Sequence, residues 1–261
     1  MSSLYHDSLI KSALRAVLAG SSLAETAVAD SQLVIQKSNF RDIVTETDLQ
    51  ISQLIIDRLA ETGLPVISEE EIAKFDEYSV YWAVDPIDGT VNFSHGLSNF
   101  AISVGLVENN NFSLGVVCAP KLDEIYFTIN NRKALMNGRP FMHTHRTVTE
   151  ALVASSFSNN AITLDYEIYR SVNDSTRGCL RTGSAALNIC WAAAGKMQAA
   201  YGFSAKLWDV AGALAIASAA GCEVRVDQTN EPLTLDYIVG SKLVVNHITQ
   251  LIKDKKGFIN K

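Results

Sequence analysis

The chain has 261 residues, which is long enough for one large domain or two closely packed halves around a substantial core. Hydrophobic residues make up 48% and charged residues 19%, a composition that excludes a disordered chain. The formal net charge is −6, and an acidic surface disfavours nucleic acid and anionic membranes as partners. It also repels an anionic ligand unless a local positive charge, such as a bound divalent cation, reverses the sign.

The cysteines and the N-terminal residues bear on the cellular compartment. The first twenty residues contain Asp7, Lys11 and Arg15 among their apolar residues, so neither a signal peptide nor a membrane span is expected there. No C-x-x-C pair occurs, and reduced thiols in a cytoplasmic protein are predicted. The four cysteines are Cys118, Cys179, Cys190 and Cys222.

The first half of the chain begins with two predicted helices. Apolar residues at helical spacing predict the first over about 9–18 and the second over about 51–59, with Thr47 or Asp48 as the cap of the second. Strands are predicted to follow at 65–68, 80–84, 100–107, 112–117 and 124–128, with a tight turn at Asn137-Gly138. His143 and His145 then fall on one face, where we expect an exposed polar surface in preference to a metal site.

After about residue 149 the pattern changes to alternating strands and helices. This change places a seam between an N-terminal α+β half, 1–147, and a C-terminal α/β half, 148–261, which we expect to pack as a single catalytic unit. The predicted strands are 151–155, 224–226 and 237–239, and the predicted helices are 165–172, 184–194, 209–220 and 247–256.

The segment 85–90, Asp-Pro-Ile-Asp-Gly-Thr, carries the clearest chemical signal. It follows an apolar strand whose hydrogen bonding the proline is expected to end. The carboxylates of Asp85 and Asp88 lie on a bend, so they can converge on one point, and the carbonyl of Ile87 can point there too. The alternative is an Asp-rich turn that binds nothing.

Neighbouring residues suit an anion. Gly89 lets the backbone approach a ligand closely, and Thr90 offers a hydroxyl and an amide at a predicted helix start, where anions are favoured. The segment 42–48 places Thr45 and Asp48 just before the second helix. For Asp48, a plain helix cap is the alternative to a site role.

Further acids can join this site. Glu69, Glu70 and Glu71 follow a predicted strand, and adjacent carboxylates repel one another unless a cation or water screens them. A solvated loop is the alternative for this run. Asp209, next to Trp208, begins a nearly uncharged predicted helix, where it is either a cap or a ligand.

Four motifs in this order resemble those of the inositol monophosphatase family. They are D-x-V-T-x-T-D at 42–48, [GS]-E-E at 68–70, D-P-I-D-G-T-x-N-F at 85–93 and W-D-x-A-G at 208–212. The segment R-T-G-S-A-A at 181–186 is similar to the family's substrate-contacting stretch. The resemblance implies a layered αβαβα sandwich of the sugar-phosphatase type, mixed α+β and α/β, with the site in the cleft between the halves.

The resemblance also implies Mg²⁺ as the cofactor and hydrolysis by water without a covalent phosphoenzyme. Glu69, Asp85 and the carbonyl of Ile87 would hold a first ion, while Asp85, Asp88 and Asp209 would hold a second. A third, weaker ion could share Glu69. All these ligands are oxygens, which suits a hard cation, and two such ions can activate water and stabilise a departing alkoxide.

The implied catalytic residues are Glu69, Thr90 and Asp48. The hydroxyl of Thr90, linked to Asp48, would orient the attacking water and take its proton. Amides around Gly89 and Thr90 would cradle the phosphate. The implied substrate-binding residues are Glu69, Ile87, Asp88, Gly89, Thr90, Gly183, Ser184, Ala185 and Asp209.

The implied substrate is a small phosphorylated polyol or sugar, with inositol 1-phosphate as the default. Gly202 stands where many inositol-cleaving members carry a glutamate, so one specificity contact is lost, worth about 1–3 kcal/mol. Ser68 replaces the usual glycine before the paired acids. If Glu70 and Glu71 carry the metal role instead of Glu69, the metal assignments shift by one residue.

Several functions of the same fold stay open. Val91 and Asn92 follow Thr90, without the lysine and acid typical of members that act on phosphoadenosine nucleotides. The close alternatives are fructose 1,6-bisphosphatase and histidinol-phosphate phosphatase, and a more distant one is a non-catalytic regulatory protein. Lithium inhibition and a homodimer are also expected from the resemblance.

Overall fold

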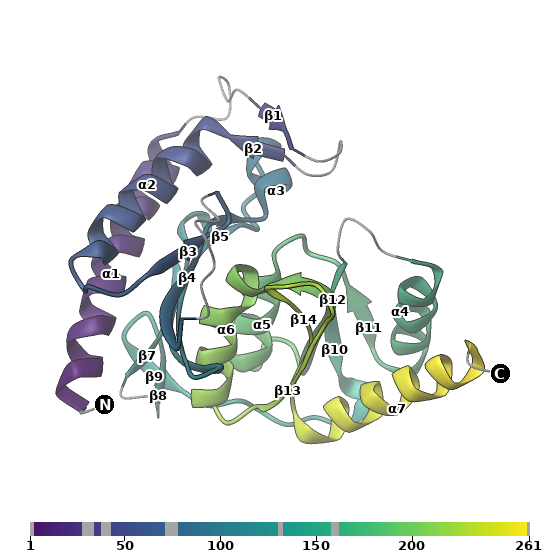
Figure 1. The fold of residues 1–261 in the computed structure, drawn as a ribbon. Helices are drawn as coiled ribbons and strands as arrows, with labels where there is room; N and C mark the ends of the chain where they lie inside the picture. The colour runs from purple at the N-terminus through teal and green to yellow at the C-terminus, as the bar shows by residue number, and fades with distance from the viewer. Residues whose placement is uncertain are drawn as a thin grey trace.

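Helices and sheets alternate in five layers (Figure 1). The computed structural model describes residues 3–27, 34–37, 43–70, 78–129, 133–157 and 162–259. The layers are, in order, α1 with α2, a seven-stranded sheet, α5 with α6, a five-stranded sheet, and α4 with α7. The predicted layered αβαβα sandwich is confirmed.

The first two layers come from the N-terminal part of the chain. Strands of the seven-stranded sheet follow one another in chain order, β3 to β9, and all neighbours are antiparallel except β3 and β4. The elements are α1 (Ser3–Thr26), β1 (Val34–Gln36), β2 (Ile43–Thr45), α2 (Glu46–Ala60), β3 (Val66–Ser68), β4 (Val80–Asp88), α3 (Thr90–Ser94), β5 (Ala101–Glu108), β6 (Asn111–Ala119), β7 (Glu124–Ile129), β8 (Lys133–Met136) and β9 (Arg139–Phe141).

The remaining layers come from the C-terminal part. The five-stranded sheet has the order β11-β10-β12-β14-β13, and its first three strands are parallel. The elements are β10 (Leu152–Phe157), α4 (Thr163–Ser175), β11 (Gly178–Leu180), α5 (Ala185–Ala193), β12 (Ala199–Lys206), α6 (Leu207–Ala219), β13 (Glu223–Gln228), β14 (Thr234–Gly240) and α7 (Lys242–Ile259). The division into halves at 147/148 stays a prediction.

Three hydrophobic clusters fill the spaces between layers. One joins α1 and α2 to the seven-stranded sheet, and another joins the five-stranded sheet to α4 and α7. The largest surrounds α5 and α6 between the two sheets. Helix α6 is buried along almost its whole length, which explains why its sequence is nearly free of charge.

Several sequence predictions need correction. The N-cap of α2 is Thr45, not Thr47 or Asp48, because the cap side chain must precede the first helical residue. Strand β4 does not end at the proline but continues to Asp88. Strand β12 was not predicted, since small residues and a glycine give it no alternating pattern.

The loop after β9 also differs from the prediction. His143 is buried and not part of an exposed polar face, because its amide donates to Ala220 and its ring Nδ1 lies 2.8 Å from the carbonyl of Ala192. Its ring packs edge-on against His145. In the described ranges no helix is both long enough and apolar enough to cross a membrane.

Candidate active site

Strand β4 carries an extra residue between its two aspartates. Side chains alternate between the faces of a strand, so residues three apart ordinarily point to opposite sides. Asp85 lies opposite Ser103 on β5 and Asp88 opposite Ala101, so three steps on β4 (85 to 88) match two on β5 (103 to 101). This bulge brings Asp88 back to the face that Asp85 occupies, which is turned toward α6. A proline is tolerated in such a bulge.

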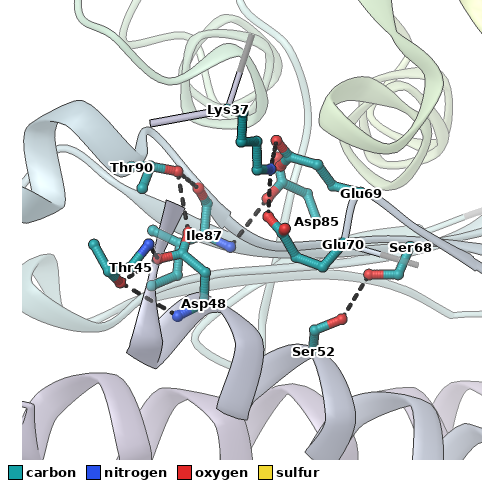
Figure 2. Close-up of polar contacts among 10 residues, drawn as sticks. All are labelled: Lys37, Thr45, Asp48, Ser52, Ser68, Glu69, Glu70, Asp85, Ile87 and Thr90. Atoms are coloured by element: carbon teal, nitrogen blue, oxygen red, sulfur yellow. Dashed lines mark hydrogen bonds and ion pairs between the residues drawn. The ribbon is translucent and has the colours of Figure 1, made fainter. Parts of the chain in front are cut away.

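The start of α2 supplies a third carboxylate. Thr45 and Asp48 form a capping box, in which the Thr45 amide donates to Asp48 Oδ2 at 3.0 Å and the Asp48 amide donates to Thr45 Oγ1 at 3.3 Å. The hydroxyl of Thr90 lies 3.1 Å from the remaining Asp48 oxygen and 3.0 Å from the carbonyl of Ile87 (Figure 2). Asp48 is therefore both a cap residue and a site residue.

Glu69 reaches the site from the end of β3. Its amide donates to the carbonyl of Val84 at 3.1 Å, which places it beside Asp85 on the neighbouring strand. The ammonium of Lys37 lies 3.0 Å from Glu69 Oε1 and 2.7 Å from Glu70 Oε1 (Figure 2). Burial lowers the pKa of Lys37, but the charges and hydrogen bonds of the two glutamates outweigh it and raise the pKa. Lys37 thus stays charged and partly neutralises the acids.

Helix α6 contributes Asp209 from the other side of the pocket. Asp209 is the third residue of the helix, and the N-cap is Lys206, whose amide donates to the Asp209 carboxylate. The backbone of the helix packs directly on the backbone of the seven-stranded sheet. The closeness is shown at Gly212, where a Cβ would lie 2.6 Å from the carbonyl oxygen of Val104. This close packing of α6 on the sheet fixes how far Asp209 reaches into the pocket.

The turn before α5 holds Asp88 in place. Ser184 Oγ donates to Asp88 Oδ2 at 2.5 Å, the Ala186 amide donates to the same oxygen at 2.7 Å, and the Ala185 amide donates to Oδ1 at 3.2 Å. An aspartate of the first sheet therefore accepts the free amides at the start of a helix from the C-terminal part. Of the three predicted substrate contacts in this turn, Gly183 lines the pocket, while Ser184 and Ala185 bond Asp88.

One open pocket gathers most of these groups, while Asp48 is linked to it through its hydrogen bond from Thr90. Its volume is about 150 Å³, small beside the ~300–1,000 Å³ clefts that enclose drug-sized ligands, so it suits ions and one small group. The lining holds no His or Cys. The lining residues are Ile43, Glu69, Asp85, Ile87, Asp88, Gly89, Thr90, Val91, Gly183 and Asp209.

Burial and mutual repulsion raise the pKa values of four aspartates at or beside the pocket. Burial raises the pKa of Asp48 to about 6, against the opposing bonds from Thr45 and Thr90. It also raises that of Asp88 to about 6, against the bonds from the α5 turn. The pKa values of Asp85 and Asp209 are raised by burial and then by the neighbouring negative charges. Each raised pKa means that the negatively charged form of that carboxyl is disfavoured in its surroundings.

These residues fit a hard divalent cation. Crowded oxygen ligands with raised pKa values are stabilised by a positive charge, and an all-oxygen lining favours Mg²⁺ over zinc or copper. Among the described side chains, no three of His, Cys, Asp or Glu stand close enough together to hold an ion as they are placed. A cation would compete with Lys37 for Glu69, so the ligand set stays a prediction.

Two neighbouring residues were missed by the sequence prediction. Lys37 has no local pattern that marks it, because its partners lie more than thirty positions away. Asn92 donates to the carbonyls of Asn99 and Thr182, and its only signal was its place in the motif 85–93. Asp42 and Glu71, which were part of the predicted motif and acid run, lie outside the described residues.

Comparisons with known proteins place the chain in a family. Residues 6–255 match the profile of the inositol monophosphatase family. The chain is 31% identical over 225 residues to the fructose-1,6-bisphosphatase/inositol-1-monophosphatase of Thermotoga maritima, which covers 85% of this chain and 86% of that protein. It is 30% identical over 244 residues to the Nus factor SuhB of Pseudomonas aeruginosa, covering 88% and 90%.

A solved structure agrees with these relatives. The structure of a Thermotoga maritima IMPase superposes with a TM-score of 0.82 at 28% identity and covers 94% of this chain and 96% of that one. The match therefore spans nearly the whole chain. On these grounds the chain belongs to the inositol monophosphatase family of phosphatases.

Proposed function

We propose that the chain hydrolyses a phosphate monoester of a small polyol, with inositol 1-phosphate as the default substrate and Mg²⁺ as the cofactor. One observation carries the proposal: carboxylates from the end of β3, from β4 and from α6 surround one small pocket, and the pKa values of Asp85, Asp88 and Asp209 among them are raised. Magnesium dependence and lithium sensitivity are traits of the family. With Mg²⁺ bound, the pocket would attract the negatively charged phosphate, which the carboxylates alone would repel.

The ligand assignment follows the positions of the carboxylates. Glu69, Asp85 and the carbonyl of Ile87 would hold one Mg²⁺, and Asp85, Asp88 and Asp209 would hold a second. When bound, these ions supply positive charge that lowers the pKa of water and offsets the charge on the departing oxygen. The raised pKa values support the assignment, because removing repulsion between buried acids is what a cation would do.

Thr90 and Asp48 would orient the attacking water. The Thr90 hydroxyl has a single proton, which it donates to either Asp48 or Ile87, so its lone pairs remain for a water molecule. With a pKa of about 6, Asp48 is mostly deprotonated at neutral pH and can accept a proton through Thr90. The amides of Gly89 and Thr90 would bind the phosphate oxygens.

The substrate side of the pocket favours no single polyol. A Cβ on Gly202 would lie 2.6 Å from Tyr237 Cε1, so the ring of Tyr237 fills the space that a longer side chain at this position would need. The acid that many inositol-cleaving members carry there has no room in this chain. Fructose 1,6-bisphosphate is therefore the second candidate substrate, supported by the double name of the Thermotoga relative.

A regulatory role is the remaining alternative. The Pseudomonas relative is named a Nus factor, and this name describes that protein and not the present chain. In this chain every carboxylate proposed as a metal ligand lines the pocket, which supports turnover. We further propose a cytoplasmic homodimer; its four free thiols support the compartment.

The test is phosphate release from a panel of esters by the purified protein with Mg²⁺. We expect turnover of inositol 1-phosphate, loss of activity on chelation, and inhibition by millimolar lithium. Asp88→Asn should lower kcat by about 100-fold or more, because it removes a charge needed beside the reacting group. Asp174→Asn, the same change at an exposed helical position, is the matched control.

Three results would change the proposal. A large preference for fructose 1,6-bisphosphate or histidinol phosphate would replace the default substrate. Unchanged turnover in Asp88→Asn would remove that residue from the site. Absence of phosphate release from every ester with Mg²⁺ would contradict the phosphatase function of this chain.

A further inference from the structure

Asn92 connects the two parts of the chain at the pocket. It lies in the short helix α3, just after the phosphate-side residues Gly89 and Thr90. Its side-chain Nδ2 donates to the carbonyl of Asn99 at 2.6 Å and to the carbonyl of Thr182 at 2.8 Å. Both amide hydrogens are therefore used, one within the N-terminal part and one across to the turn before α5.

Gly183, which follows Thr182, leaves the space that this contact needs. Gly183 has φ = +93°, and a Cβ at this position would lie 2.5 Å from Asn92 Nδ2 and 2.8 Å from its Oδ1. The missing side chain is thus what lets the Asn92 amide reach Thr182. On the other side of Gly183, its carbonyl oxygen lies 3.2 Å from where a Cβ of Gly89 would be. The two loops interlock with no spare space.

The same turn is held from behind by the C-terminal part. Thr182 Oγ1 donates to Asn188 Oδ1 at 2.6 Å, and Asn188 Nδ2 donates to Ser156 Oγ at 3.1 Å. Tyr237 donates to the same serine oxygen at 2.9 Å. Thr182 is therefore fixed at two points, its carbonyl by Asn92 and its hydroxyl by Asn188.

We propose that Asn92 is a positioning residue that sets the place of the turn 182–185, whose Gly183 lines the pocket on the side that would meet the alcohol part of the ester. Asn92 is separate from the predicted metal ligands, and Asp88 keeps its own three bonds to the α5 start without it. Removing Asn92 would loosen the alcohol side while leaving the phosphate side in place. This kinetic consequence rests on the proposed function.

The kinetic test compares two esters in Asn92→Ala. For inositol 1-phosphate, KM should rise roughly tenfold with kcat within about twofold, the scale expected for losing the hydrogen bond that holds Thr182. For 4-nitrophenyl phosphate, whose alcohol part carries no hydroxyls to recognise, kcat/KM should change by less than about twofold. Asn92→Asp should be worse than alanine for inositol 1-phosphate, since a carboxylate repels two carbonyls.

Two further variants test the same turn. Asn188→Ala removes the second anchor of Thr182 and should give the same selective rise in KM. Asn111→Ala removes a side-chain amide that donates to the carbonyl of Asn109 in an exposed turn, and should change neither ester. An equal loss on both esters in Asn92→Ala, or no change on either, would overturn the inference.

Hydrogen exchange gives a readout that needs no activity. In Asn92→Ala the amides of 182–184 should exchange roughly tenfold faster than in the parent protein, because the turn is freed at Thr182, while the Ala185 and Ala186 amides, which stay bonded to Asp88, and those of β5 and β6 keep their rates. Unchanged exchange at 182–184 would overturn the inference even if phosphate is released. If the parent protein released no phosphate, the proposed function would fail and the exchange rates alone would decide the role of Asn92.

Discussion

The two faces of the seven-stranded sheet are packed in different ways. On one face, α1 and α2 lie on large aliphatic and aromatic side chains, and residues such as Ile51, Ile55 and Trp82 fill the space. On the other face, α6 approaches so closely that a Cβ on Gly115 would overlap the carbonyl of Gly212. On one face, side chains separate the sheet from its helices, and side chains can adjust. On the other face, backbone contacts backbone, which cannot adjust.

The face with backbone packing is also the face on which the pocket lies. Helix α6 carries Asp209 three residues before Gly212, and Asp85 and Asp88 project from the same face of the sheet. A face packed by flexible side chains would let the helix shift by fractions of an ångström. A backbone-to-backbone contact fixes the distance between the carboxylates of the two parts. We conclude that one face mainly stabilises the fold, while the other also sets the geometry of the site.

The largest expected effect comes from Gly212→Ala. Its Cβ would lie 2.6 Å from the carbonyl oxygen of Val104, with only backbone able to give way, so we expect a loss of about 3 kcal/mol or more in the free energy of unfolding. Specific activity should fall as well, because Asp209 moves. Urea unfolding and the activity of the folded fraction measure both. Full activity per folded molecule would break the link between this face and the site.

A change of pH should reveal the charges at the pocket end of this face. The folded-state pKa values of Asp48 and Asp88 are raised to about 6, so between about pH 4 and 6 the folded state binds more protons than the unfolded one. Stability from these groups is therefore present at low pH and lost as pH rises through 6. A shift from 3.8 to about 6 corresponds to about 3 kcal/mol for one carboxyl.

Magnesium makes this expectation measurable. Mg²⁺ should raise Tm more at pH 7.5 than at pH 5.5, because protons already relieve the repulsion at the lower pH. Burial lowers the pKa of His143, which acts in the opposite direction, so the wild type should be compared with Asp85→Asn, which keeps that histidine. An equal Mg²⁺ increment at both pH values would show that the carboxyls do not share the ion.

The smallest effect is expected for Gly20→Ala on the opposite face. Its Cβ would meet Ile51 Cγ2 at 3.0 Å and Ile102 Cδ1 at 3.3 Å, which are side-chain methyl groups and not backbone. Helix propensity favours alanine by about 1 kcal/mol, so the net change should stay within about 1 kcal/mol, with activity kept. A loss above about 2 kcal/mol in urea unfolding would mean that this face is as rigid as the other.

The parts of the site that are close together in the chain could be predicted from the sequence. The segment 85–90 carries its own bend, and the prediction that Thr90 begins a helix is confirmed by α3. The helix that carries Asp209 was predicted from its apolar composition. These signals are local, because spacing and turn chemistry act over a few residues.

The parts that depend on pairing between distant segments could not be predicted. The β4 bulge is defined by the register against β5, which no local pattern records. Lys37 and Asn92 act through partners about 30 and 90 positions away. Small residues hid β12, and the ring of Tyr237 beside Gly202 became visible only when β14 was placed next to that strand.

The inserted residue in β4 makes the length of this segment as informative as its letters. Adding one residue between Asp85 and Asp88 would turn Asp88 toward α1 and α2, beside Phe93 and Phe100, and would bury an unpaired carboxylate in hydrocarbon. Removing one would erase the bulge and the bend that it gives the strand. A substitution in this segment can have a small or a large effect, but any change in its length alters the bulge. In an evolutionary record of such chains, this stretch should accept changes of identity while its residue count stays constant.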